Sequence, residues 1–381
     1  MKKFFLMSVF AVWMIIYALC VYGAQSSSTP ATQSPPALTA PADWQARWNQ
    51  TSAEGKKEGK VVLYGDMGPI FKSKVTEAFK RKYGIDVEIV AGKPPEVAQK
   101  FLTERAANLS LVDVLMTGQT TTLTILKPRK VLVSSKSSLM LPEVLDSKAW
   151  PHGVLPYIDK DQIALGLTAG YMKFVTINKE VVKEGEITSY TDLLHPKWKG
   201  KITIYDPSMP GNGGSWLAFM MKAFGREAGE KYLRQLAVQN PVITRDVRMQ
   251  GETVARGKYA IGIGASPQAV QDLARAGAPI VWVRMKEGGL VLHGALVAAM
   301  PDKPAHPAAA ALMFNFLLSK EGQQICSEAI GFLPMRRDVP LTHELEESAP
   351  KSGDKVYWLD EETVLTEPSY YPMVRDVFGL K

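Results

Sequence analysis

Short apolar runs alternate with amphipathic segments through residues 60–116, and this order constrains the fold more than any other feature. The first run, KVVLY, is typical of a strand and ends in the turn-forming residues 65–69. The next segment carries apolar side chains at helical spacing and stops at Gly84, a residue suited to a helix end. This β-α-β-α-β order predicts a parallel sheet flanked by helices. The strands are expected over 60–64, 85–90 and 111–116, and the helices over 71–83 and 95–107.

A second α/β region follows. The length of 381 residues leaves room for it, because a single core usually stops growing near ~250–300 residues. We therefore predict an α/β protein with two Rossmann-like lobes. Ligands of open α/β sheets bind beyond the carboxyl ends of the strands, so the candidate binding residues are those that follow strands. Further strands are expected over 163–167, 173–177, 201–205, 259–263, 279–283 and 290–299, and further helices over 190–194, 216–224, 226–236, 251–256, 267–275, 307–318 and 322–329.

Composition excludes several classes of protein. Hydrophobic residues make up 46% of the chain and charged residues 22%, as in a globular protein rather than a disordered, fibrous or multi-span membrane chain. Two cysteines cannot form a disulfide framework or a four-ligand zinc site, and no two of the five histidines are spaced as a helical metal pair. We therefore expect no metal site and no cofactor. The formal charge of +7 suits an anionic ligand slightly, but without a Lys/Arg run it does not indicate nucleic-acid binding.

The N-terminal segment predicts export. Lys2 and Lys3 precede an apolar run up to Gly23, so residues 1–23 have the pattern of a secretory signal. The run is near the ~20 residues that span a bilayer, which leaves an uncleaved anchor as an alternative. Lipidation at Cys20 is a third, although the residues before it match a lipidation signal poorly. Residues 24–42 are rich in Ser, Thr, Pro and Ala and predict a mobile tether. Each alternative places the folded part in the periplasm or on the exterior of the cell envelope.

Four motifs, in this order along the chain, resemble those of extracellular solute-binding proteins. The similarity extends over roughly residues 55–380, and the branch it resembles most is the ferric-iron-binding and organic-anion-binding branch of the type-two periplasmic binding proteins. The motifs are HPKWKGKI at 195–202, VARGKYAI at 254–261, HPAAA with FNFLLSKEGQ at 306–323, and GFLPMR at 331–336.

The resemblance implies a fold and a function. It implies two α/β lobes joined by a hinge of two crossing strands, closing on a ligand in the cleft, and delivery of that ligand to the membrane permease of an ABC importer. It implies a monomer without enzymatic activity. The N-terminal lobe would be discontinuous and would include the helices of 306–325. Its expected extent is 43–160 plus 278–330, and that of the C-terminal lobe is 161–277 plus 331–381.

The segment PGNGGS at 210–215 is the strongest candidate anion site. Its glycines allow a tight turn with exposed amides, and Ser215 could cap the helix expected to follow. Free N–H groups and the dipole at a helix N-terminus attract an anion. A plain Gly-rich turn with a capping serine is the alternative. The candidate ligand-binding residues here are Asn212, Gly213, Gly214 and Ser215.

Two further candidates lie in the second region. Arg245 could grip a carboxylate or phosphonate with two parallel hydrogen bonds, or it could form a surface ion pair with Asp246. Tyr171 lies near an expected crossing strand, where it could present a hydroxyl to the ligand or pack in the core.

The first region supplies candidates after two of its strands. Thr117, Gln119 and Thr120 follow the strand at 111–116 and offer hydroxyls and an amide, although a Thr-rich helix cap explains them equally well. Asp66 lies in the turn after the first strand, where it could contact the ligand or cap the next helix.

Ferric iron and catalysis are weaker interpretations. The iron-binding branch uses adjacent tyrosines after the strand equivalent to 259–263, where this chain has GIGASP, so tight ferric binding by that route is doubtful. Iron held by carboxylates and an exogenous anion remains an alternative, as does a ligand sensor that docks a membrane receptor. Gly-x-Ser-x-Gly does not occur around Ser215 or Ser266, and no motif pairs a nucleophile with a histidine. The sequence therefore predicts a binding protein for a small anion, such as a carboxylate or phosphonate.

Overall fold

The structure is a computed structural model that describes residues 39–380 apart from Asp66. The predicted export segment and residues 24–38 of the tether lie outside the described residues. The described chain divides into two compact units, which comprise residues 39–170 with 292–349 and residues 171–291 with 350–380. These boundaries differ from the predicted 160, 277 and 330. The chain passes between the units within β5 (Ala164–Met172) and β11 (Gly289–Pro301), two unbroken strands, and again after Ala349.

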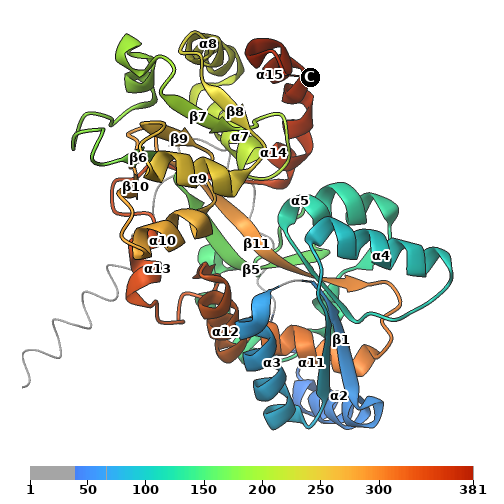
Figure 1. Cartoon of the computed structure of the whole chain (residues 1–381). Helices are drawn as coiled ribbons and strands as arrows, with labels where there is room; N and C mark the ends of the chain where they lie inside the picture. The colour runs from blue at the N-terminus through green and yellow to red at the C-terminus, as the bar shows by residue number, and fades with distance from the viewer. Residues whose placement is uncertain (1–38, 66, 381) are drawn as a thin grey trace, which may run out of the picture. The chain divides into compact units, whose positions relative to one another are not determined.

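The first unit is built on the predicted parallel sheet. Strands β1 (Lys60–Tyr64), β2 (Asp86–Val90) and β3 (Val114–Thr117) are parallel, and β11 pairs antiparallel with β3 (Figure 1). The full strand order is β12-β5-β11-β3-β1-β2. The helices are α2 (Trp44–Glu58), α3 (Gly68–Tyr83), α4 (Pro94–Ala106), α11 (Pro307–Leu318) and α12 (Lys320–Ile330).

Helix α11 is the centre of the core of this unit. All residues from Ala308 to Leu318 are buried, which explains why the helix is apolar on every side. Asn315 is the polar exception, and its side chain bonds to backbone groups of residues 138, 140, 141 and 311. The smaller elements of the unit are α5 (Gln119–Thr121), a π-helix (Thr122–Leu126), β4 (Leu132–Val133), α6 (Pro142–Leu145), β12 (Leu333–Pro334) and α13 (His343–Ser348).

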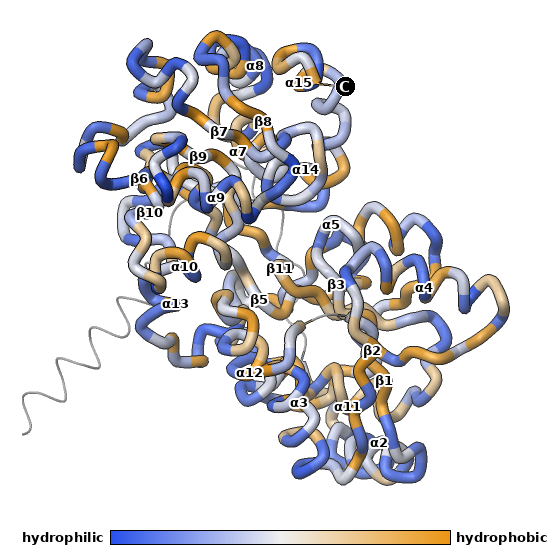
Figure 2. The backbone as a smooth tube through the Cα atoms, viewed as in Figure 1, coloured by the Kyte–Doolittle hydropathy of each residue, from blue (hydrophilic) through white to orange (hydrophobic). Residues whose placement is uncertain are grey.

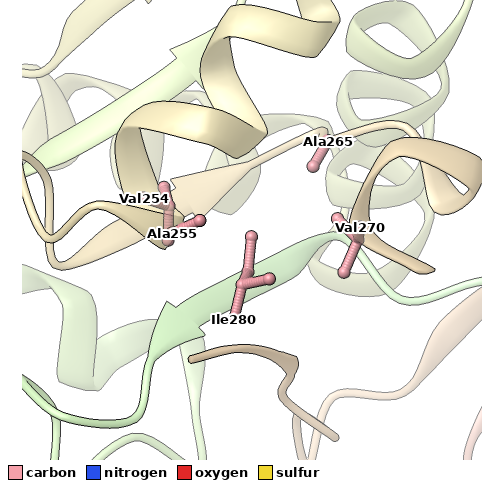
Figure 3. Close-up of a cluster of buried hydrophobic side chains, with 5 residues drawn as sticks. All are labelled: Val254, Ala255, Ala265, Val270 and Ile280. Atoms are coloured by element: carbon pink, nitrogen blue, oxygen red, sulfur yellow. The ribbon is translucent and has the colours of Figure 1, made fainter. Parts of the chain in front are cut away.

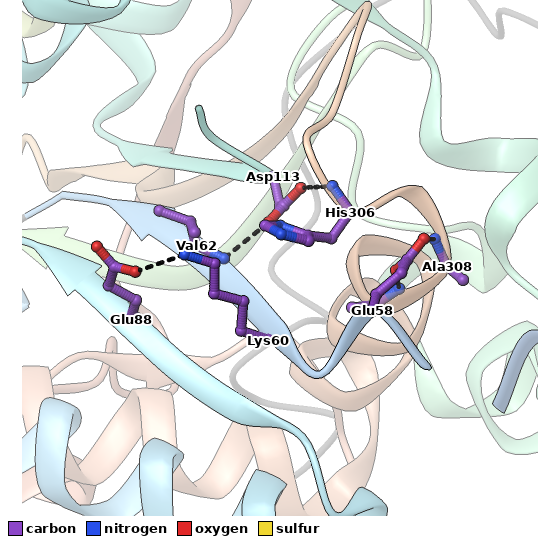
Figure 4. Close-up of polar contacts among 8 residues, drawn as sticks. Glu58, Lys60, Val62, Glu88, Asp113, His306 and Ala308 are labelled. Atoms are coloured by element: carbon purple, nitrogen blue, oxygen red, sulfur yellow. Dashed lines mark hydrogen bonds and ion pairs between the residues drawn. The ribbon is translucent and has the colours of Figure 1, made fainter. Parts of the chain in front are cut away.

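A buried carboxylate joins β1 to the segment before α11. Asp113 is fully buried, and its Oδ2 accepts hydrogen bonds from the Val62 amide at 2.8 Å and from Nδ1 of His306 at 2.8 Å (Figure 4). Its Oδ1 accepts from the His306 amide at 2.5 Å. His306 is 193 residues from Asp113 in the sequence, and Val62 is 51 residues from it. The carboxylate therefore joins distant parts of the chain.

The start of α11 is capped by an acid from another helix. The two carboxylate oxygens of Glu58, at the end of α2, accept hydrogen bonds from the amides of Ala308 at 3.2 Å and Ala309 at 2.7 Å (Figure 4). These amides belong to the first turn, where no intrahelical acceptor exists. The chain therefore satisfies this helix start with its own negative charge.

The second unit holds a five-stranded mixed sheet in the order β10-β6-β9-β7-β8. Strand β7 (Ile202–Tyr205) is parallel to β8 (Val242–Thr244) and to β9 (Ile261–Ile263). Strands β6 (Val175–Asn178) and β10 (Ile280–Trp282) pair antiparallel at the other side. The helices are α7 (Asn212–Phe224), α8 (Arg226–Ala237), α9 (Val247–Ala255) and α10 (Pro267–Arg275).

A small apolar cluster holds α9 and α10 to this sheet. Val254 and Ala255 of α9, Ala265, Val270 of α10 and Ile280 of β10 are buried together (Figure 3). Figure 2 shows how hydropathy varies along the chain: β11 has hydrophobic colours, and the charged α13 has hydrophilic ones. The alternation of strand and helix thus places apolar faces inward, as the sequence predicts.

The C-terminal segment folds back on the second unit. Strand β13 (Val356–Leu359) is followed by α14 (Glu361–Thr366), a 3-10 turn over Glu367–Tyr370 and α15 (Tyr371–Phe378). The 3-10 turn contacts α7, and α15 contacts α8. Neither α2 nor these C-terminal elements was predicted. Helix α2 has few apolar residues, whereas the VYWL run of β13 was a usable strand signal that was overlooked.

Two predicted boundaries are wrong in ways that matter for the site. Residues 168–171 belong to the single strand β5 and do not separate two strands. Helix α7 begins at Asn212, four residues before the predicted start at 216, so the glycines are in its first turn and Ser215 does not cap it. In the described part of the chain, no helix has both the length and the apolar character needed to cross a membrane.

Candidate functional site

Three parallel strands of the second unit end at one edge of the sheet. Asp206 follows β7, Arg245 follows β8 and Gly264 follows β9. Helices α7, α9 and α10 begin just beyond, so three helix N-termini, each carrying partial positive charge, lie at this edge (Figure 1). This is the edge at which open α/β sheets bind ligands.

The three helix starts differ in how their amides are satisfied. The Asp246 side chain accepts from the amides of Arg248 and Met249 and caps α9, and the Ser266 side chain caps α10. Helix α7 has Gly211 at its N-cap position and receives no side-chain cap. Of the three, the α7 start is therefore the one suited to receive an anion from outside the chain.

The amides of the α7 start divide into two pairs. The Gly214 amide donates to the carbonyl of Met209 at 2.9 Å, and the Ser215 amide donates to that of Gly211 at 2.8 Å. For the amides of Asn212 and Gly213, no acceptor occurs among the described residues. The pair that can meet a ligand is thus Asn212–Gly213, one step earlier than the predicted Gly213–Ser215.

Glycines are required in this turn by packing. A Cβ at Gly213 would lie 2.0 Å from the Asp206 carbonyl oxygen, and one at Gly214 would lie 2.0 Å from Oε1 of Glu367. Gly211 has a φ of 99°, a left-handed conformation that favours glycine. The glycines therefore let the strand end and the C-terminal segment close on the first turn of α7.

An ion pair lies beside the helix start. Asp206, which is 1% exposed, accepts from Nε of Arg245 at 2.9 Å and from the Ser208 hydroxyl at 2.7 Å. Burial acts to raise the pKa of Asp206, but the hydrogen bonds from Ser208 and Arg245 outweigh it and hold that pKa below its usual range. The Arg245 side chain is 62% exposed, so the guanidinium extends from a buried anchor toward solvent.

A second carboxyl approaches the same turn from the C-terminal segment. Glu367 is 3% exposed, and its Oε1 accepts from the Tyr371 hydroxyl at 2.5 Å. Burial raises the pKa of Glu367 to about 7, against the opposing effect of the Tyr371 hydrogen bond. Burial and the neighbouring Glu367 also raise the pKa of Tyr371. The α7 start thus combines two orphan amides, one arginine and two buried acids.

The other predicted residues lie elsewhere. The Thr117 and Thr122 hydroxyls are 2.7 Å apart in the first unit, Gln119 is buried beside them, and the Thr120 carbonyl accepts from the Thr124 hydroxyl. Asp66 lies outside the described residues. The unit division separates this group from the α7 start.

Tyr171 and Arg245 have partners that the sequence did not indicate. The Tyr171 hydroxyl lies 3.4 Å from Oδ2 of Asp354, its ring packs on Gly289, and burial raises its pKa. Arg245 pairs with Asp206, whereas Asp246, its predicted surface partner, caps α9. Tyr171 therefore helps to anchor the C-terminal segment, and Arg245 belongs to the α7 start.

Sequence reasoning missed Asp206, Ser208, Glu367 and Tyr371. The position of Asp206 directly after β7 was a usable signal, because strand ends carry ligand groups in this class of fold. Nothing in the local sequence around Glu367 indicates that it is buried. Within the described residues, no group of three or more His, Cys, Asp and Glu side chains could hold a metal ion.

Comparisons with known proteins agree with the fold. Residues 74–351 match the family of bacterial extracellular solute-binding proteins. A Salmonella typhimurium protein, whose name proposes 2-aminoethylphosphonate binding in the periplasm, is 25% identical over 274 residues, which are 70% of this chain and 75% of that protein. Iron-bound HitA from Pseudomonas aeruginosa has a TM-score of 0.64 at 21% identity, over 84% of this chain and 99% of HitA.

A third relative was solved with a sugar phosphate. AfuA from Actinobacillus pleuropneumoniae, with exogenous fructose-6-phosphate bound, has a TM-score of 0.61 at 18% identity, over 85% of this chain and 100% of AfuA. The structural likenesses confirm the predicted fold, that of the type-two periplasmic binding proteins.

Proposed function

The chain belongs to the bacterial extracellular solute-binding proteins, and from that premise we propose that it captures a small oxyanion, such as a phosphonate or carboxylate, at the start of α7. Proteins of this family bind small ligands outside the cytoplasmic membrane and work with membrane ABC permeases. They are transport proteins and not enzymes. What we propose beyond the family is that the ligand is a small oxyanion and that it binds at the start of α7.

One observation carries the proposal. The amides of Asn212 and Gly213 have no acceptor among the described residues, although the neighbouring helices α9 and α10 are capped by their own side chains. A helix start gains typically ~0.3–1 kcal/mol from an anion at exposed sites. Hydrogen bonds to a charged group contribute about 1.5–3 kcal/mol each. Arg245 supplies a cation at the same strand edge, held in place by Asp206.

The names of the relatives support an oxyanion. A phosphonate and a sugar phosphate are the ligands named for two of them, and both present several acceptor oxygens to N–H donors. Ferric iron is the second candidate, because HitA was solved with iron and Glu367 with Tyr371 offers hard oxygen ligands at this site.

Two variants of one residue isolate the amide. Asn212→Pro removes the N–H at the first helical position, where proline is tolerated. The matched control, Asn212→Ala, keeps the N–H and loses only the side-chain bond to the Ala265 carbonyl. We expect the proline variant to bind roughly ten- to a hundredfold more weakly than the alanine variant, the value of one charged hydrogen bond.

The measurement is calorimetric titration with 2-aminoethylphosphonate, fructose-6-phosphate, citrate and ferric citrate. Equal affinities of the two variants for every anion that binds would show that the α7 start is not the anchor. If ferric citrate binds and none of the metal-free anions does, the oxyanion proposal is wrong and iron transport takes its place.

A further inference from the structure

The sheet of the second unit has a second edge, opposite the α7 start. Strands β7, β8 and β9 are parallel and begin at this edge, and the antiparallel β6 ends there. The Asn178 amide donates to the Ala260 carbonyl at 3.0 Å, and the Ala260 amide donates to the Lys201 carbonyl at 2.9 Å. The Gly200 amide donates to the Gln239 carbonyl at 2.7 Å. Four segments that are distant in sequence therefore lie side by side at this edge.

Four lysines gather at this edge, which we call the lysine edge. Lys199 and Lys201 precede β7, Lys258 precedes β9, and Lys179 directly follows β6. All four are exposed, and no acid among the described residues forms an ion pair with any of them. Three of the four belong to the motifs HPKWKGKI and VARGKYAI, which supply no residue to the α7 start. The binding site therefore leaves these lysines unexplained.

Neighbouring acids do not neutralise the lysine edge. Glu186 is paired with Lys197 at 2.5 Å, so that pair adds no net charge. The loop after β6 carries Glu180 and Glu184 but also Lys183, and all three are exposed. Positive charge therefore prevails at this edge, and the partner that complements it is negatively charged.

Exposed apolar side chains lie beside the lysines. Val181, three residues after β6, is 46% exposed, and Val238, next to Gln239, is 66% exposed. Cationic and apolar side chains together suit the interface of an anionic bilayer. Lysine is a compact point charge, whereas recognition of single carboxylates on a protein favours the two parallel hydrogen bonds of arginine. The composition of the edge thus favours a lipid surface over an acidic protein.

We propose that the lysine edge docks on a membrane surface that contains anionic phospholipid. Each lysine near such a surface strengthens binding about fivefold, and salt screens the attraction. The sequence leaves an anchor at residues 1–23 as an alternative, and a chain as long as residues 24–42 spans at most about 65 Å. Docking by this edge leaves the α7 start free, because that start lies beyond the opposite ends of the strands.

Acetylation of individual lysines tests the proposal. The full-length protein is treated with a water-soluble acetylating reagent in the presence of vesicles, and mass spectrometry follows each lysine. The vesicles are pure phosphatidylcholine or phosphatidylcholine with about a quarter of phosphatidylglycerol. We expect the anionic vesicles to slow acetylation of the lysine edge about fivefold relative to the neutral ones, and about 0.5 M sodium chloride to abolish the difference. Lys56, Lys57 and Lys72, exposed and without an acidic partner among the described residues, are the internal controls.

Two charge-matched double variants show whether the lysine edge itself makes the contact. Lys199→Gln with Lys201→Gln should remove the protection of Lys258, because the attraction to the anionic surface weakens. Lys56→Gln with Lys57→Gln, on α2 of the first unit, should leave that protection unchanged. Both variants remove the same charge from exposed positions, so net charge alone cannot produce a difference between them. Unchanged urea unfolding verifies that both are folded.

Three outcomes would overturn the proposal. Protection of the lysine edge that does not exceed that of the control lysines would show that the edge makes no special contact. Equal protection by neutral vesicles would show that anionic lipid is not the partner. Protection by polyglutamate without protection by anionic vesicles would assign the edge to an acidic protein surface. None of these outcomes bears on the proposed function, which concerns the opposite edge of the sheet.

Discussion

Helices α11 and α7 begin in opposite ways. The start of α11 in the first unit receives both carboxylate oxygens of Glu58 on the amides of Ala308 and Ala309. The start of α7 in the second unit has a glycine at its N-cap position and two amides with no acceptor among the described residues. Every helix start attracts negative charge, so the two starts differ in whether a side chain of the protein provides that charge. The chain itself caps the α11 start, as it caps α9 and α10, whereas the α7 start receives no side-chain cap.

The largest effect is expected at Asp113, which bonds the segment just before α11. Asp113→Ala should lower the free energy of unfolding by about 3–5 kcal/mol, because the Val62 amide and His306 lose their buried partner. Urea denaturation measures it. The control is Glu88→Gln in the exposed Lys60–Glu88 pair, where about 0–1 kcal/mol is expected. If both variants lose the same small amount, Asp113 does not tie the α11 start to β1. Anion affinity at α7 should be unchanged wherever Asp113→Ala is folded.

The second-largest effect is a pH dependence of stability caused by Glu367, the buried acid beside the start of α7. The pKa of Glu367 is about 7 in the folded protein and near the usual 4.5 when unfolded, so the folded state holds the proton more tightly. Stability should therefore fall as pH rises from about 4.5 to about 7 and stay level above, by about 3 kcal/mol in all.

Glu367→Gln should remove this fall and make the protein more stable than the wild type above about pH 7. Thermal or urea unfolding across this pH range, without added anions, measures it, with Glu362→Gln as the control. A wild-type profile that is flat between these values, or one that rises, would mean that Glu367 is ionised in the folded protein.

The two helix starts also show what sequence reasoning can reach. The alternation over residues 60–116 is regular, so β1, β2, α3 and the parallel sheet were predicted correctly. The anion site at 210–215 stays a prediction, but the start of α7 was placed four residues late, because the glycines were interpreted as a turn although they form helix. Asn212 and Arg245 were predicted from local pattern alone.

Glu367 could not be predicted from its neighbours. It follows the exposed Thr366 and precedes a proline, and only the return of the C-terminal segment onto α7 buries it. Its contact with Gly214 joins residues far apart in sequence, and no local period records such a contact. For the same reason the partner of Tyr171 could not be predicted, since Asp354 lies in that segment.

The smallest expected effect tests the comparison most directly. Glu58→Ala empties the α11 start and should cost about 0.5–2 kcal/mol, the usual value of a lost cap. If an uncapped start is by itself an anion site, sulfate should restore part of that loss in proportion to its concentration, because a ligand that binds only the folded state stabilises it. The wild type, with Glu58 in place, should gain less from the same sulfate, and sodium chloride at matched ionic strength controls for screening. Unfolding midpoints in urea give all three values. Equal gains for variant and wild type would mean that amides without an acceptor do not by themselves make an anion site.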